Sequence, residues 1–210
     1  MSMMLIGQYD SPFVRRVAIT LRWYGLEYEH RPWSVWGDAE KIALYNPLRR
    51  VPTLVIDGGL ALQDSAAIID TLDELAGEER ALLPRSGPVR REGLRLVALS
   101  TGLADKAVSL LYEKLFRAEP SQLWLGRCAL QIMDTLALLE ADRTARATPF
   151  WLGESLSHVD VAFACAFRFA REAHPTLFAT SSYPALEAEA ARCEALEHFS
   201  RVVQPILNEV

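Results

Sequence analysis

The chain changes in character near residue 77, and this change limits what it can fold into. Before that point, short apolar runs alternate with amphipathic stretches. From residue 89 onward, apolar residues recur about every 3.6 positions and no convincing strand is visible. The stretch between the two regions is rich in charge, glycine and proline, as interdomain linkers are. We therefore expect an α/β domain over residues 1–77, a linker over 78–88 and an all-α bundle over 89–210.

The first region predicts the element order β-α-β-α-β-β-α. Short apolar or β-branched runs indicate strands, and apolar residues on one face indicate helices. The expected strands are 3–7, 27–31, 53–56 and one that begins at 60–62, and the expected helices are 12–24, 38–44 and 65–76. This order predicts a small mixed sheet that combines a right-handed crossover with a closing hairpin.

The second region predicts helices separated by proline-containing breaks. The expected helices are 89–117, 121–143, 157–173, 184–194 and 196–207. Ser157 and Asp160 stand three residues apart just before an apolar run, which is the spacing of a reciprocal helix cap. We expect that cap to be structural.

Composition narrows the class of protein. Half of the residues are apolar and 23% are charged, which is typical of a folded domain and too apolar for a disordered chain. The net charge is −5 with both signs scattered, which argues against nucleic acid as the main partner. No apolar run approaches the ~20 residues that cross a bilayer, so no membrane association is expected. Residues 1–10 lack the pattern of a signal peptide, so we do not expect export.

The cysteines argue against disulfide and metal chemistry. Cys128, Cys165 and Cys193 are odd in number and widely spaced, with no CxxC pair and no histidines at metal-ligand spacing. We expect no metal site and reduced, buried thiols of a cytoplasmic protein. No cysteine precedes Cys128, so the first region has no thiolate that could attack a disulfide.

Three short motifs lie at junctions between the expected elements. Ser11-Pro12 begins a helix, where a hydroxyl beside the free N–H groups and the positive dipole end suits an anion. Val51-Pro52 precedes a strand, and a cis bond there leaves the Val51 backbone to pair with an extended ligand. Asp64-Ser65 opens another helix and offers donors to a carboxylate and a carboxylate to an ammonium. Taken singly, two plain caps and a trans proline at an edge strand are the favoured interpretations.

Together and in this order, the motifs resemble the cytosolic glutathione transferase superfamily. Residues 11–16 (SPFVRR), 51–54 (VPTL) and 64–68 (DSAAI) stand where that family keeps its catalytic, cis-proline and γ-glutamyl-binding segments. The resemblance covers essentially the whole chain and is nearest to bacterial serine-type members close to the theta and zeta classes. It implies a thioredoxin-like N-terminal domain followed by an all-α helical bundle domain.

The resemblance also implies roles for individual residues. Ser11 matches the hydroxyl that donates a hydrogen bond to the glutathione sulfur. Val51, before a cis proline, matches the backbone that pairs with the cysteinyl part, and Arg50 falls where a polar side chain meets the glycine carboxylate. The matched glutathione-binding residues are Arg50, Val51, Pro52, Asp64 and Ser65. Whether Asp105 reaches a γ-glutamyl amine across a dimer interface stays open.

The resemblance implies a glutathione transferase that is cytoplasmic and homodimeric and that acts in detoxification. Glutathione is its co-substrate, and a small hydrophobic electrophile is its second substrate. A glutathione-dependent isomerase or peroxidase, and a non-catalytic interaction module, remain as alternatives. Tyr9 is a rival to Ser11 because other members use a tyrosine, although a packing role for it is favoured. Candidates for the electrophile pocket are Phe13, Trp33, Trp36, Tyr112 and Phe116.

Overall fold

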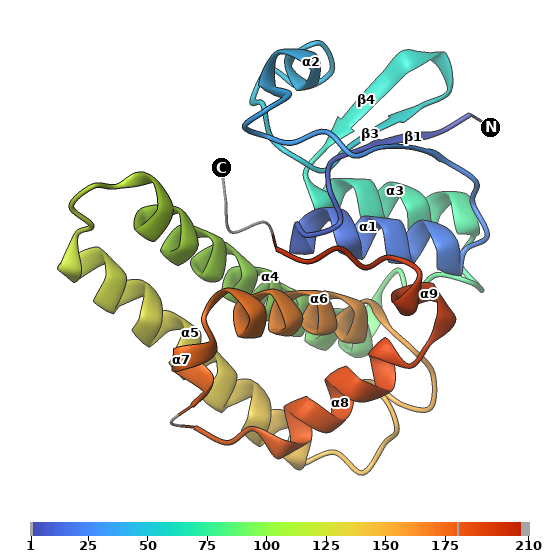
Figure 1. Ribbon diagram of the computed structural model, residues 1–210. Coiled ribbons are helices and arrows are strands. Elements are labelled where there is room, and N and C mark those ends of the chain that lie inside the picture. The colour runs from blue at the N-terminus through green and yellow to red at the C-terminus, as the bar shows by residue number, and fades with distance from the viewer. Residues whose placement is uncertain (1, 180, 207–210) are drawn as a thin grey trace. The chain divides into compact units, whose positions relative to one another are not determined.

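The computed structural model describes residues 2–179 and 181–206, and the chain divides into two compact units (Figure 1). Unit 1 consists of the described residues of Met1–Arg85 and Leu196–Val210, and unit 2 of those of Ser86–Ala195. By its contacts the final segment thus belongs with the N-terminal region, whereas its sequence pattern predicts that it belongs to the helical region.

Unit 1 contains a four-stranded mixed sheet in the order β2-β1-β3-β4. Strand β1 pairs in parallel with β2 and antiparallel with β3, and β3 pairs antiparallel with β4. The strands are β1 (Met4–Ile6), β2 (Glu29–Arg31), β3 (Thr53–Ile56) and β4 (Leu60–Gln63), and a 3-10 turn, η1 (Asp57–Gly59), joins the last two. The helices are α1 (Pro12–Trp23), α2 (Ala39–Ala43) and α3 (Ser65–Ala76). The expected β-α-β-α-β-β-α order is confirmed, and it is the thioredoxin-like arrangement.

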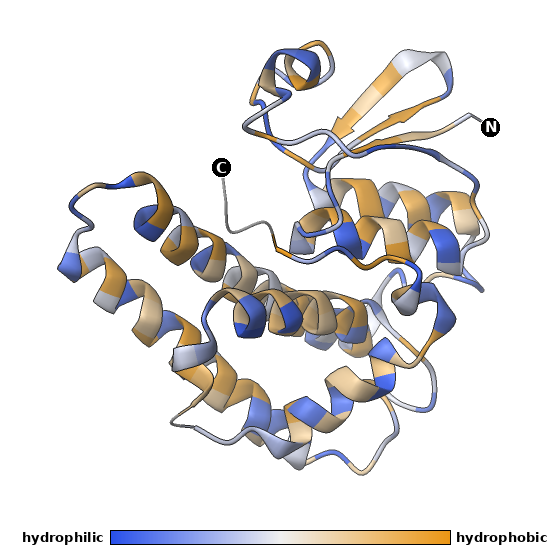
Figure 2. Cartoon of the chain, in the orientation of Figure 1, coloured by the Kyte–Doolittle hydropathy of each residue, from blue (hydrophilic) through white to orange (hydrophobic). Residues whose placement is uncertain are grey.

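Helices α1 and α3 pack together against the sheet and form the core of unit 1 (Figure 1). Strands β3 and β4 are mostly orange in Figure 2, in keeping with the apolar runs that predicted them. The fully buried core side chains include Leu5, Ile6, Val17, Leu21, Leu54, Ile68 and Leu72. The apolar residues Ala67, Ile68, Leu72 and Leu75 predict the inner face of α3, and only Ile68 and Leu72 of these are buried. Ala67 and Leu75 are exposed, while Ile69 and Asp73 are buried. The buried Ser65 sets the phase of this helix, and its inner face repeats three and four residues later.

Unit 2 is helical. Its helices are α4 (Gly87–Phe116), α5 (Gln122–Thr144), α6 (His158–Ala173), α7 (Pro175–Phe178) and α8 (Pro184–Glu194). Helix α6 contacts α4, α7 and α8, and twelve of its sixteen residues are buried. No helix among residues 2–179 and 181–206 is long and apolar enough to cross a membrane.

The reciprocal cap that begins α6 is confirmed. The Ser157 Oγ accepts a hydrogen bond from the Val159 N–H, and an Asp160 carboxylate oxygen accepts one from the Ser157 N–H at 2.7 Å. The other Asp160 oxygen accepts from the Trp151 N–H at 2.8 Å. The cap therefore also fixes the loop that leads into the helix.

The expected helix over residues 196–207 is wrong beyond Ser200. Helix α9 covers only Glu197–Ser200, and Leu207 lies outside the described residues. Arg15 of α1 donates to the carbonyls of Phe199 and Val202, which a continuing helix needs for its own hydrogen bonds. Pro205 has no N–H to donate and disfavours a helix interior.

Candidate functional site

Ser11 occupies the N-terminal cap of α1. Its backbone is extended (φ −65°, ψ 122°), and its Oγ accepts a hydrogen bond from the Val14 N–H at 3.4 Å. Pro12 follows at the first helical position, where its missing N–H costs nothing. Because the Oγ acts here as an acceptor, its hydrogen stays available to donate to a group outside the helix. The half-buried hydroxyl thus lies at the positive end of the α1 dipole, which favours an anion.

Gly7 brings the first turn of α1 next to Val51. A Cβ atom on Gly7 would lie 2.5 Å from Val14 Cγ2 and 2.8 Å from Val51 Cβ. The φ of Gly7 is +127°, which residues with side chains rarely adopt. The end of β1, the first turn of α1 and the loop at residue 51 therefore meet where only a glycine fits. The motifs around Ser11 and Val51 lie against this same glycine.

The loop before β3 carries the Val51-Pro52 peptide bond, which is cis. Asn46 is 1% exposed and fixes this loop, since its Nδ2 donates to the Arg50 carbonyl at 2.9 Å and to Thr53 Oγ1 at 3.0 Å. Among the described residues, the backbone N–H and C=O of Val51 have no hydrogen-bond partner. Both groups are therefore free to pair with an extended peptide ligand.

Asp64 and Ser65 form the N-terminus of α3. Asp64 has a φ of 70° and caps the helix, its Oδ1 accepting from the Ala66 N–H at 2.8 Å. Its side chain is exposed, whereas Ser65 is buried. The Ser65 Oγ accepts a hydrogen bond from Arg16 Nη1 at 3.3 Å. This helix end thus offers an exposed carboxylate beside a hydroxyl held by a buried arginine.

Arg50 stands apart from the other candidates. Its carbonyl accepts from Asn46, but its exposed side chain makes no hydrogen bond or ion pair with any described residue. The structure thus leaves this guanidinium at the surface beside Val51, without joining it to the Ser11 or Asp64 side chains.

Three residues that support the site were missed by the sequence analysis. The sequence predicts Gly7 as the end of a strand, and it places Asn46 just after a predicted helix and before Pro47. Arg16 is 3% exposed, although it is one of two adjacent arginines, a pattern typical of a solvent-facing surface. Arg16 bonds Ser65, which is 49 residues away, so no local pattern marks it as buried. The partners of Asn46 lie within seven residues, but they depend on the conformation of the loop before β3.

Tyr9 is tied into the fold on two sides. Its hydroxyl lies 2.8 Å from that of Tyr28, and its ring stacks on His30 with centroids 4.0 Å apart. Burial, with the Tyr28 hydrogen bond, raises the pKa of Tyr9 above its ordinary value. A phenol that resists ionisation and is already hydrogen-bonded fits the packing role that the sequence analysis favoured.

The three cysteines are free and buried, as expected. Burial raises the pKa of both Cys128 and Cys193, so their thiols stay protonated at neutral pH. Because a thiol reacts as its thiolate, these residues are poor nucleophiles.

The candidate electrophile-pocket residues are divided between the two units. In unit 1, Phe13 is half-buried, Trp33 lies 6.1 Å from Tyr45 between ring centroids, and Trp36 is 50% exposed. In unit 2, Tyr112 and Phe116 meet edge to face at 5.4 Å.

Two further features of unit 2 lie apart from these residues. Asp105 is exposed on α4 and pairs with Lys106 at 3.2 Å. A surface cavity of about 530 Å³ between α6 and α8 is lined by none of the candidate residues.

Comparison with known proteins gives matches along most of the chain. Residues 5–80 match the family described as glutathione S-transferase, N-terminal domain, and residues 122–188 match glutathione S-transferase, C-terminal domain. YibF of Escherichia coli K12, described as an uncharacterized GST-like protein, is 30% identical over 168 residues, which cover 78% of this chain and 80% of YibF.

Solved structures match over nearly the full length. A glutathione S-transferase from Methylobacterium radiotolerans, in complex with glutathione sulfonate, is 26% identical with a TM-score of 0.88 and covers 100% of both chains. A glutathione transferase family member from Pseudomonas fluorescens Pf-5, with bound glutathione, is 27% identical with a TM-score of 0.83. That match covers 97% of this chain and 100% of the other.

Proposed function

The chain belongs to the glutathione S-transferase family, and from this premise we propose that it is a serine-type glutathione transferase. Glutathione is its co-substrate, and the glutathione thiolate attacks a small hydrophobic electrophile. The observation that carries the proposal is the Ser11 hydroxyl at the N-terminus of α1, whose first turn meets the loop of Val51 at Gly7. The Val51 backbone has no hydrogen-bond partner among the described residues. The relatives crystallised with glutathione or glutathione sulfonate support the choice of ligand.

Ser11 has the chemistry to activate a thiol. A free thiol has a pKa of about 8.5, so about 3% is ionised at pH 7. A hydrogen bond from the Ser11 hydroxyl and the positive end of α1 both favour the anion. Lowering the thiol pKa by about two units corresponds to ~2.7 kcal/mol and makes most of the bound thiol nucleophilic at pH 7.

The rest of the site binds the tripeptide. The Val51 N–H and C=O pair with the cysteinyl backbone, as a strand would. The Asp64 carboxylate pairs with the γ-glutamyl ammonium, and the Ser65 hydroxyl and the first N–H groups of α3 bind its carboxylate. The exposed guanidinium of Arg50 is within the same loop as Val51 and binds the glycine carboxylate.

Two measurements test this function. Calorimetric titration with glutathione should give a binding isotherm, and Ser11→Ala should bind glutathione with little change in affinity. In the variant, the rate of conjugation to a reactive aryl chloride should fall, and its pH–rate profile should move to higher pH. Tyr9→Phe is the matched control and should leave that profile in place. An unchanged profile in Ser11→Ala would overturn the assignment of Ser11.

The same measurements separate the alternatives. The absence of heat at millimolar glutathione would favour a non-catalytic interaction module. Binding without conjugation would favour isomerase or peroxidase chemistry, which a panel of substrates can distinguish.

We also propose a cytoplasmic homodimer that acts in detoxification. Three buried free thiols support the reducing compartment, and the exposed Leu123 and Leu130 of α5 support an oligomer. Analytical ultracentrifugation that shows only a monomer would contradict the proposed homodimer.

A further inference from the structure

The segment after α8 is fastened to α1 through Arg15. We call residues 196–206 the C-terminal strap. The Arg15 Nε donates to the Val202 carbonyl at 2.7 Å, its Nη2 donates to the Phe199 carbonyl at 3.3 Å, and its guanidinium lies 5.9 Å from the Phe199 ring centre. Arg15 is 3% exposed, and the side chains of Phe199 and Val202 are fully buried. Figure 1 shows the strap, in red, running alongside α1.

Beyond Arg15, the strap reaches the loop that leads into Ser11. The Gln204 Oε1 accepts a hydrogen bond from the backbone N–H of Tyr9 at 3.1 Å. Tyr9 stands two residues before Ser11, in a loop that belongs to no strand or helix. The other side of this loop is fixed by His30, whose Nε2 donates to the Gly7 carbonyl at 2.8 Å and whose ring stacks on Tyr9. Gln204 is therefore the contact that holds the loop on the side of the strap.

The strap is anchored strongly enough to hold that loop in place. A buried guanidinium must have acceptors, and two carbonyls of the strap supply them to Arg15. Losing both would take two acceptors from a buried charge, so detachment of this part of the strap is costly. Gln204 follows Val202 by two residues and so has little freedom to leave Tyr9.

We propose that Gln204 is a positioning residue for Ser11. By holding the Tyr9 N–H, it fixes the loop that sets where the Ser11 hydroxyl points, and so governs how much of the bound thiol is ionised. A displacement of about 1 Å in such a group can cost up to a hundredfold in rate. This inference rests on the proposed role of Ser11.

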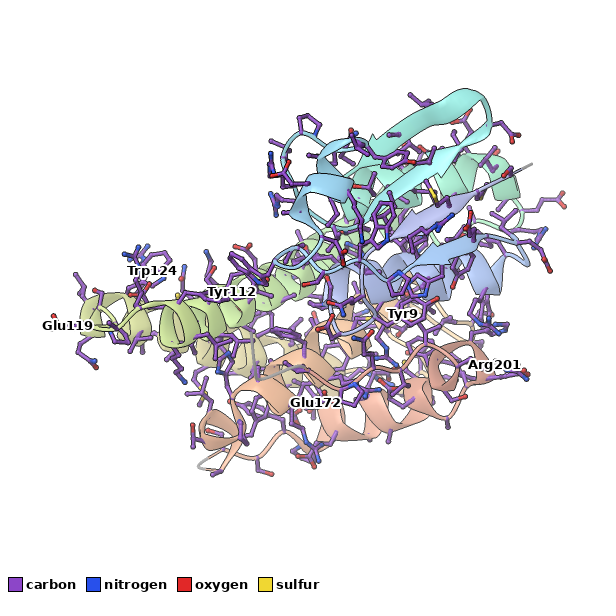
Figure 3. All side chains as sticks on the ribbon, turned by 45° about the horizontal axis from the view of Figure 1, so that its top comes forward. Tyr9, Tyr112, Glu119, Trp124, Glu172 and Arg201 are labelled. Atoms are coloured by element: carbon purple, nitrogen blue, oxygen red, sulfur yellow. The ribbon has the colours of Figure 1, made fainter. Side chains whose placement is uncertain are left out.

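The test compares three variants of the full chain. Gln204→Ala removes the acceptor, and Gln204→Glu keeps an oxygen at the same chain length. Arg201→Ala is the matched control, because Arg201 lies in the strap but pairs only with the exposed Glu197 among the described residues. Figure 3 shows Arg201 extending outward, away from Tyr9.

Three quantities are measured for each variant. The first is hydrogen exchange at the Tyr9 amide. The second is the ionised fraction of bound glutathione at pH 7, from the ultraviolet absorbance of its thiolate. The third is the affinity for S-methylglutathione, which keeps the peptide contacts and lacks the thiol.

In Gln204→Ala we expect faster exchange at Tyr9 and a thiolate fraction lower by about threefold or more. The affinity for S-methylglutathione should stay within about twofold, because the tripeptide contacts of Val51 and Asp64 are untouched. Gln204→Glu should restore slow exchange and most of the ionised fraction, and Arg201→Ala should match the parent protein.

The outcomes separate this inference from the proposed function. If Tyr9 exchange or the thiolate fraction does not change in Gln204→Ala, while Ser11→Ala does lower the fraction, the positioning role is wrong and the function stands. If Gln204→Ala loses affinity for S-methylglutathione by as large a factor as it loses thiolate fraction, the site has loosened as a whole. That result would also overturn the positioning role. If Ser11→Ala leaves the fraction unchanged, the role of Ser11 fails, and the positioning role with it.

Discussion

Gly7 is the residue on which three parts of the candidate site meet. Gly7→Ala places a methyl group 2.5 Å from Val14 Cγ2 at a φ of +127°. Overpacking and backbone strain together should lower the free energy of unfolding by about 2–5 kcal/mol. Gly25→Ala is the control, since its φ is +68° but no atom lies within 4 Å of the new Cβ. Gly25→Ala should lower the free energy of unfolding by only about 1–2 kcal/mol. Equal losses in urea unfolding would show that the close approach at Gly7 is unimportant.

Asp64 combines a cap, an unusual backbone conformation and a charge, and substitution can separate them. Asn tolerates the φ of 70° and caps a helix as well as Asp does, but it carries no charge. Asp64→Asn should therefore leave the free energy of unfolding within about 0.5 kcal/mol of the parent value. It should weaken glutathione binding about tenfold or more, because the proposed ion pair with the γ-glutamyl ammonium is lost. Calorimetry and urea unfolding measure the two effects.

Asp64→Ala provides the contrast. It loses the cap and strains the backbone as well, so both affinity and stability should fall. If Asp64→Asn binds glutathione normally, the carboxylate has no role in holding the ammonium.

At the residue scale, the sequence predicts the groups that act locally and misses those that act across the fold. Ser11 and Asp64 precede helices, and their capping roles follow from neighbours two and three residues away. Arg16 bonds Ser65, which is 49 residues away, and its burial depends on how α1 and α3 pack. No local pattern carries that information, so the hydrogen bond that holds Ser65, in the proposed γ-glutamyl subsite, emerges only in three dimensions.

The cap of α6 makes the stability of this element depend on pH. Burial raises the pKa of Asp160 to about 6, although hydrogen bonds from Ser157 and Trp151 favour the ionised form. An unfolded Asp has a pKa of about 3.9, so the folded state binds the proton more tightly. This contribution is fully present below pH ~4 and is lost as pH rises through about 6, by on the order of 3 kcal/mol.

Asp160→Asn removes the titrating group and tests this dependence. The slope of stability against pH between 4 and 7 should be flatter in the variant than in the parent protein, whatever the variant's absolute stability. Urea unfolding at a series of pH values measures both slopes, and parallel curves would contradict the expected titration.

At the element scale, periodicity predicts where helices form but not how far they continue. The strands and the helices from α1 to α6 follow from local patterns to within a few residues. The helix expected to end near residue 207 stops at Ser200, because Arg15 competes for its carbonyls. A tertiary contact, invisible in the local pattern, decides where this helix ends.

At the scale of the whole molecule, unit 1 is discontinuous in sequence. The chain leaves it at Arg85 and returns at Leu196, with unit 2 inserted between. If unit 2 unfolds, docking the strap must close a flexible loop of about 110 residues. Such a closure costs about 4 kcal/mol. A folded unit 2 holds its two ends at a fixed separation and largely avoids this cost, so the stability of unit 1 depends on that of unit 2.

Ser157→Ala tests this coupling, because it acts inside unit 2 and touches no group of the glutathione site. Loss of the α6 cap should lower stability by about 0.5–2 kcal/mol. Because docking of the strap on unit 1 depends on a folded unit 2, peptides of both units should lose protection from hydrogen exchange at the same, lower urea concentration. Saturating glutathione should raise that common midpoint. Its proposed contacts lie in unit 1, and a ligand that binds folded unit 1 also stabilises a unit 2 that unfolds together with unit 1. If only the peptides of unit 2 shifted, the two units would unfold independently, and the strap would dock without help from the domain that precedes it.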